Sequence, residues 1–172
     1  MGKKLQKHMR LETKKIYLLL GTNLGERLQY LQDALILIAE KVGVVGRKSS
    51  IYETAAWGKT DQPGFLNLAV EVETLLTPIE LLHVVLEIEK LLGRIRHEKW
   101  GARVIDIDII LYDDQIVDLK DQLQIPHPEM QYRRFVMQPL SEIAEDVLHP
   151  ILKKSMKAIL SDLTDSLDVV KL

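Results

Sequence analysis

The sequence predicts an α+β fold: one domain with the element order β-α-β-β-α-β, followed by a C-terminal helical appendix. Three observations carry this prediction. Short apolar runs of strand length alternate along the chain with two longer segments of helical periodicity. Residues after Arg134 are mostly helical in pattern. The length of 172 residues suits a single domain.

The first three predicted elements are short and bounded by glycines. The apolar run at 16–20 is a buried strand that ends at Gly21, and residues 21–25 form a loop. A helix follows over 26–41, and a second strand covers 44–54. The apolar positions predicted to face the core in this helix are Leu28, Leu31, Leu35 and Ile38.

The middle of the chain contains a long loop and a clear helix start. Residues 55–65 are long for a connection, which favours a functional loop. Residues 66–74 alternate apolar and polar, which predicts a strand with one wet face, antiparallel to the strand before the loop. Thr77 and Glu80 form a capping box for a helix over 78–92.

The remaining elements complete the order. Residues 104–112 predict an apolar strand, and 115–118 a short return strand, after which Pro126 and Pro128 exclude regular structure. The helical pattern after Arg134 breaks at His149-Pro150. The result is the ferredoxin-like split βαβ arrangement, with helices on one face of an antiparallel sheet.

Composition narrows the classes of partner. The 23 basic and 25 acidic residues give a net charge of −2, which disfavours nucleic acid and anionic membrane. The absence of cysteine excludes disulfides, and no apolar run reaches membrane-spanning length. Residues 1–15 read as a basic, flexible extension without a signal-peptide core, and 16–172 as the domain. We expect a cytoplasmic monomer.

Two acids interrupt the apolar strand at 104–112. Side chains alternate along a strand, so Asp106 and Asp108 point the same way, while Ile105, Ile107, Ile109 and Leu111 face the core. Two converging carboxylates suit Mg2+, which combines a few carboxylates with substrate phosphates. The alternative is an edge strand with one solvated face. The apolar flanks favour a central strand, where unpaired carboxylates are costly.

A basic stretch directly precedes this strand. Its cations are Arg94, Arg96, His97, Lys99 and Arg103, around Trp100-Gly101. Arg and Lys suit phosphate oxygens, so cations beside the paired acids resemble a triphosphate site. The alternative is a solvated basic loop anchored by Trp100.

Four other positions are candidates. Glu89 interrupts a buried helix stripe, so it is functional or paired with a nearby Arg. Asn67, on the predicted wet face, can read a heterocycle edge, or is a plain surface residue. His127 lies between two prolines and is either structural or a phosphate contact. The two phenylalanines, Phe65 and Phe135, adjoin polar clusters, where stacking competes with a core role.

Together these residues resemble the 6-hydroxymethyl-7,8-dihydropterin pyrophosphokinase family from about Tyr17 to Pro150. The order and spacing of the pieces are specific, although each piece alone is weak. The pieces are Leu20-Gly21-Thr22-Asn23-Leu24-Gly25, Asp61-Gln62-Pro63-Gly64-Phe65-Leu66-Asn67, Gly93-Arg94-Ile95-Arg96 through Trp100-Gly101-Ala102-Arg103, Asp106-Ile107-Asp108-Ile109, and Pro126-His127-Pro128 through Arg133-Arg134-Phe135-Val136.

The resemblance implies a ferredoxin-like enzyme of folate biosynthesis that moves the β,γ-pyrophosphate of ATP to the pterin hydroxymethyl group and releases AMP. It implies that Asp106 and Asp108 hold two Mg2+ ions. The catalytic cations would be Arg94 and Arg103. ATP, the co-substrate, would contact Glu89, Arg96, Trp100, His127 and Arg133. The pterin would contact Gly21, Asn23, Thr54, Trp57, Phe65, Asn67 and Phe135.

Some positions depart from the family pattern. Leu86 stands where a glutamine can assist ATP binding, and Gln122 and Gln124 where an arginine and a threonine can contact the nucleotide. Two rival functions remain from the residues alone. One is another Asp-x-Asp nucleotidyl or glycosyl transferase, which would not release AMP by this route. The other is a non-catalytic ferredoxin-like module for ligand or RNA, although the paired acids would repel RNA phosphates.

Overall fold

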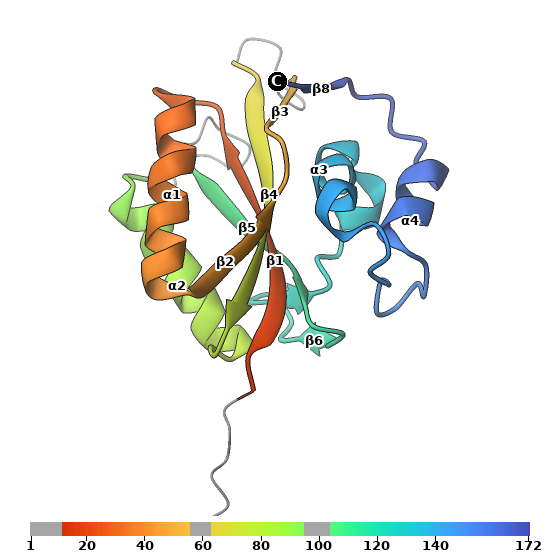
Figure 1. Cartoon of the computed structure of the whole chain (residues 1–172), viewed down its shortest axis with the longest axis horizontal. Helices are drawn as coiled ribbons and strands as arrows, with labels where there is room; N and C mark the ends of the chain where they lie inside the picture. Colours follow the sequence, from red (N-terminus) through yellow and green to blue (C-terminus); the bar gives the residue numbers. More distant parts are fainter. Residues whose placement is uncertain (1–11, 56–62, 95–103) are drawn as a thin grey trace, which may run out of the picture.

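The computed structural model describes residues 12–55, 63–94 and 104–172. It shows an antiparallel sheet between two helical layers (Figure 1). Within these residues the strands of the main sheet are β1 (Lys14–Thr22), β2 (Gly43–Lys48), β3 (Tyr52–Thr54), β4 (Phe65–Thr74), β5 (Asp106–Tyr112) and β8 (Val169–Lys171). A two-stranded sheet holds β6 (Val117–Asp118) and β7 (Gln124–Ile125). The helices are α1 (Arg27–Lys41), α2 (Pro78–Leu91), the 3-10 turn η1 (Met130–Tyr132), α3 (Arg134–Ala144) and α4 (Met156–Asp162).

The strand β1 lies between β4 and β5 and brings the site residues together. It pairs with β4 on one side and β5 on the other, so Gly21 lies opposite both Asn67 and Asp106. The strand begins before the apolar run. Lys14 and Lys15, which the sequence assigned to the N-terminal extension, belong to it because their backbone still pairs with β4.

Helices α1 and α2 cover one face of the sheet, as the predicted fold requires (Figure 1). Leu31, Ala34 and Ile38 of α1 are fully buried in the core beneath them. Leu28, predicted to face the core, is instead 53% exposed. It lies one turn before Leu31, so the first turn of α1 extends beyond the part of the helix that packs on the sheet.

The capping box of α2 is confirmed. The Thr77 hydroxyl accepts the Glu80 N–H at 3.4 Å, and the Glu80 carboxylate accepts the Thr77 N–H at 2.8 Å. These bonds satisfy two backbone donors that a helix start would leave unpaired. The helix therefore begins where the sequence placed it, and this fixes the position of Glu89 three turns later.

The single strand predicted over residues 44–54 is wrong. The structure has two strands, β2 and β3, and both pair with β4. Three residues, Ser49, Ser50 and Ile51, separate them. The Ser49 hydroxyl accepts the Ala69 N–H at 2.9 Å, while the Ser50 N–H and hydroxyl donate to Glu142 at 2.9 and 2.8 Å. Side-chain bonds of this kind compete with regular strand pairing.

The strand β5 lies at the edge of the described sheet, next to β1 alone, so the predicted central position is wrong. Its register with β1 shifts between Tyr17 and Leu18. The shift changes the alternation predicted for its C-terminal end. Leu111 packs in the core on the α3 side, whereas Ile105, Ile107 and Ile109 pack under α1 and α2. A β-bulge reverses side-chain alternation in this way.

The C-terminal region forms a second helical layer on the opposite face of the sheet (Figure 1). Helices α3 and α4 pack with buried residues of β1 and β4 in a second core. This layer covers the face of β4 that was predicted to be wet. Asn67 on that face is only 3% exposed, and the expectation of helices on one face holds only for α1 and α2. The last strand, β8, was not predicted and pairs with β3.

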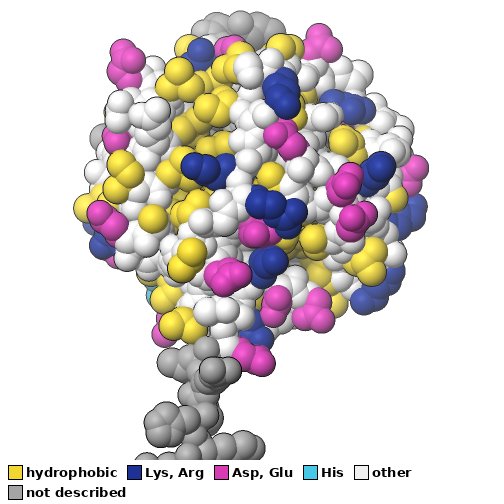
Figure 2. Space-filling view, in the orientation of Figure 1, with side chains coloured by type: hydrophobic (Ala, Val, Ile, Leu, Met, Phe, Trp, Pro, Cys, Tyr) yellow, Lys and Arg dark blue, Asp and Glu magenta, His cyan; other side chains and the backbone are white. Residues whose placement is uncertain are grey.

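Surface charge is mixed on the face shown in Figure 2, where basic and acidic side chains are interspersed. This agrees with the small net charge of the chain. Among the helices of the described residues, none has the length and apolar character needed to cross a bilayer.

Candidate active site

Two hollows meet at the paired aspartates. The first has a volume of about 760 Å³ and lies against β1, β3, β4 and the C-terminal layer. The second, of about 460 Å³, lies between α2, β5 and residues 120–128. Within the described residues, Asp106, Asp108 and Arg133 are the three that line both. The arrangement allows two different ligands to bind on either side of one pair of carboxylates.

The aspartates point to the same side of β5, as the alternation predicted. Asp106 is held by Arg94, whose Nη1 donates to Oδ1 at 2.8 Å. No group of three or more metal-binding side chains occurs in the described part of the chain. The protein thus offers two carboxylates, and the remaining ligands of an ion would have to come from elsewhere. This donor set fits Mg2+, which typically binds one or two carboxylates together with substrate phosphates.

Glu89 forms the ion pair that the sequence left as one of two alternatives. Its side chain is 4% exposed and pairs with Arg94. Its Oε1 also accepts the Ile107 N–H at 3.4 Å. Arg94 therefore lies between Glu89 and Asp106, and the three side chains form one charge cluster at the wall of the second hollow.

His127 presents a neutral imidazole to the second hollow. Its backbone N–H donates to the Ile110 carbonyl at 3.0 Å, and its Nδ1 accepts the Glu129 N–H at 3.2 Å. Burial, followed by the positive charge of Arg133, lowers the pKa of His127. A neutral ring whose Nδ1 accepts a hydrogen bond carries its proton on Nε2, where it can donate to a ligand.

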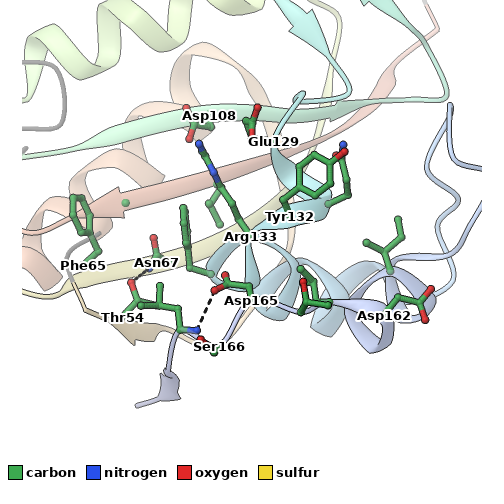
Figure 3. Close-up of a pocket in the computed structure, with 18 of the residues that line it drawn as sticks. Thr54, Phe65, Asn67, Asp108, Glu129, Tyr132, Arg133, Asp162, Asp165 and Ser166 are labelled. Atoms are coloured by element: carbon green, nitrogen blue, oxygen red, sulfur yellow. Dashed lines mark hydrogen bonds between the residues drawn. The ribbon is translucent and has the colours of Figure 1, made fainter. Parts of the chain in front are cut away.

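The first hollow has a floor of small and polar groups. Asn67 donates from Nδ2 to the Thr54 hydroxyl at 3.1 Å, a bond drawn as a dashed line in Figure 3. A Cβ added to Gly21 would lie 3.4 Å from Asn67 Oδ1 and 3.8 Å from Phe65 Cδ1. Glycine at this position therefore keeps the floor open between the amide and the aromatic ring.

Aromatic and cationic groups form the walls of the same hollow. Phe65 and Phe135 both line it, from β4 and α3. In Figure 3 the Arg133 side chain points toward Asp108, and its guanidinium carbon lies 5.8 Å from the centre of the Phe135 ring. A planar heterocycle with polar edges suits such a space, because rings can stack while the amide of Asn67 binds the edge.

One predicted residue lies elsewhere. Asn23 is fully buried and is not among the residues that line the first hollow. Its Nδ2 donates to the Pro63 carbonyl at 3.4 Å, so it supports the segment that leads into β4. The contact of Asn23 with the pterin that the resemblance implies stays a prediction.

Four predicted residues fall in the segments that the structure does not describe. Trp57 belongs to 56–62, and Arg96, Trp100 and Arg103 belong to 95–103. Their roles remain predictions.

The structure adds residues that sequence reasoning missed. The C-terminal segment lines the first hollow through Leu163, Thr164, Asp165, Ser166 and Leu167. Glu129, Gln131 and Tyr132 line it as well. The strand β8 brings this segment back to the sheet, and its local signal, the β-branched pair Val169 and Val170, is too short to predict a strand by itself.

The fold and the site define a class: a ferredoxin-like α+β enzyme domain whose paired carboxylates lie between two ligand compartments. Crystal structures of Plasmodium falciparum HPPK-DHPS support the fold. The wild type with STZ-DHP has a TM-score of 0.72 at 19% identity, covering 87% of this chain and 43% of that one. The A437G form with STZ-DHP also gives 0.72, at 18% identity, over 92% of this chain and 47% of that one. At this identity the likeness shows the fold alone.

Sequence relatives identify the family. The 2-amino-4-hydroxy-6-hydroxymethyldihydropteridine pyrophosphokinase of Aquifex aeolicus is 42% identical over 83% of this chain and 88% of its own length. The protein of that name from Bacillus subtilis is 46% identical over 76% of this chain and 78% of its own. Residues 17–145 match the family model for 7,8-dihydro-6-hydroxymethylpterin-pyrophosphokinase. The chain belongs to this family, which confirms the resemblance found in the sequence.

Proposed function

We propose that this chain transfers the β,γ-pyrophosphate of ATP to the hydroxymethyl group of 6-hydroxymethyl-7,8-dihydropterin, forming AMP and the dihydropterin diphosphate in folate biosynthesis. Family membership supplies the reaction. The observation that supports it in this chain is the position of Asp106 and Asp108 at the junction of the two hollows. A group passing from a ligand in one hollow to a ligand in the other would cross this junction.

The first hollow is the proposed pterin site. Phe65 and Phe135 would hold the ring between them, and Asn67 and Thr54 would bind its polar edge beside the open floor at Gly21. Trp57 and Asn23 are also proposed to contact the pterin. The second hollow is the proposed ATP site, with Arg133 and the Nε2 of His127 facing the phosphates. Arg96 and Trp100 are proposed to add to this site.

The paired aspartates are the proposed ligands of Mg2+, with two ions expected. Bound Mg2+ would neutralise the phosphate charge and acidify the attacking hydroxyl. The Arg94 guanidinium lies 2.8 Å from Asp106, so it would be close to phosphates held by an ion on that carboxylate. Arg94 and Arg103 would stabilise charge as it develops, and transfer of this kind depends mainly on positioning and charge. No side chain is required to act as a general base.

The chain is further proposed to act in the cytoplasm as a monomer, with small molecules rather than nucleic acid or membrane as its partners. For nucleic acid, the support is the mixed charge on the face shown in Figure 2, because a nucleic-acid surface is normally a basic field.

The test is nucleotide analysis after incubation with ATP, Mg2+ and the hydroxymethyl-dihydropterin. When the ATP is labelled at the γ-phosphate, we expect unlabelled AMP and a labelled pterin product. Asp108→Ala should lower the rate by about 10² to 10³-fold, as when one preorganised electrostatic group is removed. The matched control is Asp114→Ala, an exposed aspartate in the turn after the same strand.

The result that would overturn the proposal is equal turnover by the two variants, or release of inorganic pyrophosphate in place of AMP. The latter would indicate a nucleotidyl transferase. Binding of both ligands without AMP formation would indicate a non-catalytic module. Circular dichroism of each variant checks that its fold is unchanged.

A further inference from the structure

The C-terminal segment after α4 runs along the proposed pterin hollow before it joins the sheet. Residues 163–167 line the first hollow, and Figure 3 places Asp165 and Ser166 at its wall below Arg133. No residue of 163–171 lines the second hollow. The segment therefore contacts one ligand compartment and not the other.

Asp165 fastens this segment to the first residue of α3. Its Oδ2 accepts the Arg134 N–H at 2.9 Å, and its Oδ1 accepts the Leu167 N–H at 3.0 Å. The Arg134 side chain returns the contact, since its Nε donates to the Asp165 carbonyl at 3.0 Å. Arg133, the N-cap of α3, provides no side-chain cap, so the carboxylate of Asp165 serves that purpose from a distant part of the chain.

The other end of the segment is fastened to β3. The strand β8 pairs with β3 so that Val169 lies opposite Thr54 and Val170 opposite Glu53. The Leu172 N–H donates to the Ile51 carbonyl at 3.0 Å. Hydrogen-bonded pairs recur every second residue in an antiparallel ladder, which makes Val170 and Glu53 the next bonded pair.

These two anchors join the two walls of the hollow. Phe135 follows Arg134 in α3, and Thr54 ends β3 and binds Asn67. We infer that the C-terminal segment is a strap that sets the spacing between Phe135 and the floor at Thr54, and that Asp165 is a positioning residue for the pterin. Both carboxylate oxygens of Asp165 accept backbone N–H groups, one from Arg134 of α3 and one from Leu167 of the strap, so the role inferred for Asp165 is to hold α3 and the strap together. This inference rests on the proposed function.

The experiment measures the binding of each ligand separately by calorimetry. Hydroxymethyl-dihydropterin is titrated in the presence of Mg2+ and a non-hydrolysable ATP analogue, and the analogue is titrated alone with Mg2+. Asp165→Ala should weaken pterin binding about tenfold, or about 1.4 kcal/mol. Binding of the analogue should change by less than about twofold, because the strap does not touch the second hollow. The Michaelis constant for the pterin should rise in parallel, with that for ATP unchanged.

Two further variants sharpen the test. Asp168→Ala is the matched control, an exposed aspartate of the same segment that does not line the hollow. Val170→Pro loosens the second anchor by removing a backbone donor from β8. It should also weaken pterin binding, so it tests the inference even if Asp165→Ala fails to fold.

The inference is overturned if the Asp165 and Val170 variants bind pterin as tightly as Asp168→Ala does. It is also overturned if both ligands weaken together, since that would make the strap a general stabiliser of the fold. Wild-type protein that binds the ATP analogue but no pterin would overturn the proposed function, and this inference with it.

Discussion

Glu89→Gln is the sharpest test of the charge cluster at the site. The carboxylate of Glu89 is buried, pairs with Arg94 and accepts the Ile107 N–H. Glutamine has the same size and keeps one acceptor, so the change removes the charge with little change in volume. We expect a loss of stability much larger than for an exposed ion pair.

The contacts that Arg94 keeps in the variant determine how much stability is lost. Breaking a fully buried pair by removing one partner costs about 3–5 kcal/mol, because the other charge is left uncompensated. Arg94 would still have Asp106 at 2.8 Å, so its charge stays partly neutralised. We therefore expect about 1.5–3 kcal/mol, the range for a hydrogen bond to a charged group. For a domain of this size the melting temperature should fall by roughly 3–12 °C.

The assay is urea unfolding of matched variants, with thermal unfolding as a second measure. The control is Glu87→Gln on the same helix, where the carboxylate is 54% exposed and lies 3.2 Å from Lys41. An exposed pair of this kind contributes at most about 1 kcal/mol, and salt weakens it further. If both substitutions cost the same small amount, the reasoning that the Glu89 pair stabilises the site is wrong.

Two further predictions concern binding and pH. Asn67→Ala should raise the Michaelis constant for the pterin about tenfold and leave that for ATP unchanged, because it removes the amide beside Thr54. Steady-state kinetics with each substrate varied would check it, and equal effects on both constants would contradict it. His149 is 3% exposed, its Nδ1 accepts the N–H groups of Ile151 and Leu152, and burial lowers its pKa. Its contribution to stability is therefore complete above about pH 6.5, the pKa of unfolded histidine, and is lost as pH falls through the lower folded pKa. Urea unfolding at pH 7.5 and 5.5 should show a smaller loss for His149→Gln than for wild type, and equal losses would contradict the assignment.

The local parts of the fold were predictable because their causes are local in sequence. The capping box of Thr77 and Glu80 fixes the start of α2 within four residues. The alternation along β5 placed Asp106 and Asp108 on one face without knowledge of any neighbour. The same holds for the interruption at Glu89, which the sequence linked either to function or to a nearby arginine. The structure provides Arg94 as the partner.

The errors arose where distant segments meet. Asn67 was placed on a wet face because alternation shows which residues share a face but not what covers it. The cover is α3, some seventy residues later in the chain. The strand β8 escaped notice for the same reason: a three-residue strand is stabilised by the edge of β3 and has little local preference of its own.

The incorrect position of β5 has the largest consequence for the site. A central strand would have had both rows of backbone groups paired with neighbouring strands. As an edge strand among the described residues, β5 offers its outer row to side chains and loops instead. The Ile107 N–H binds Glu89, and the Ile110 carbonyl accepts from the backbone of His127. These two contacts bring the second hollow against the aspartates, so the edge position itself explains why two compartments meet there.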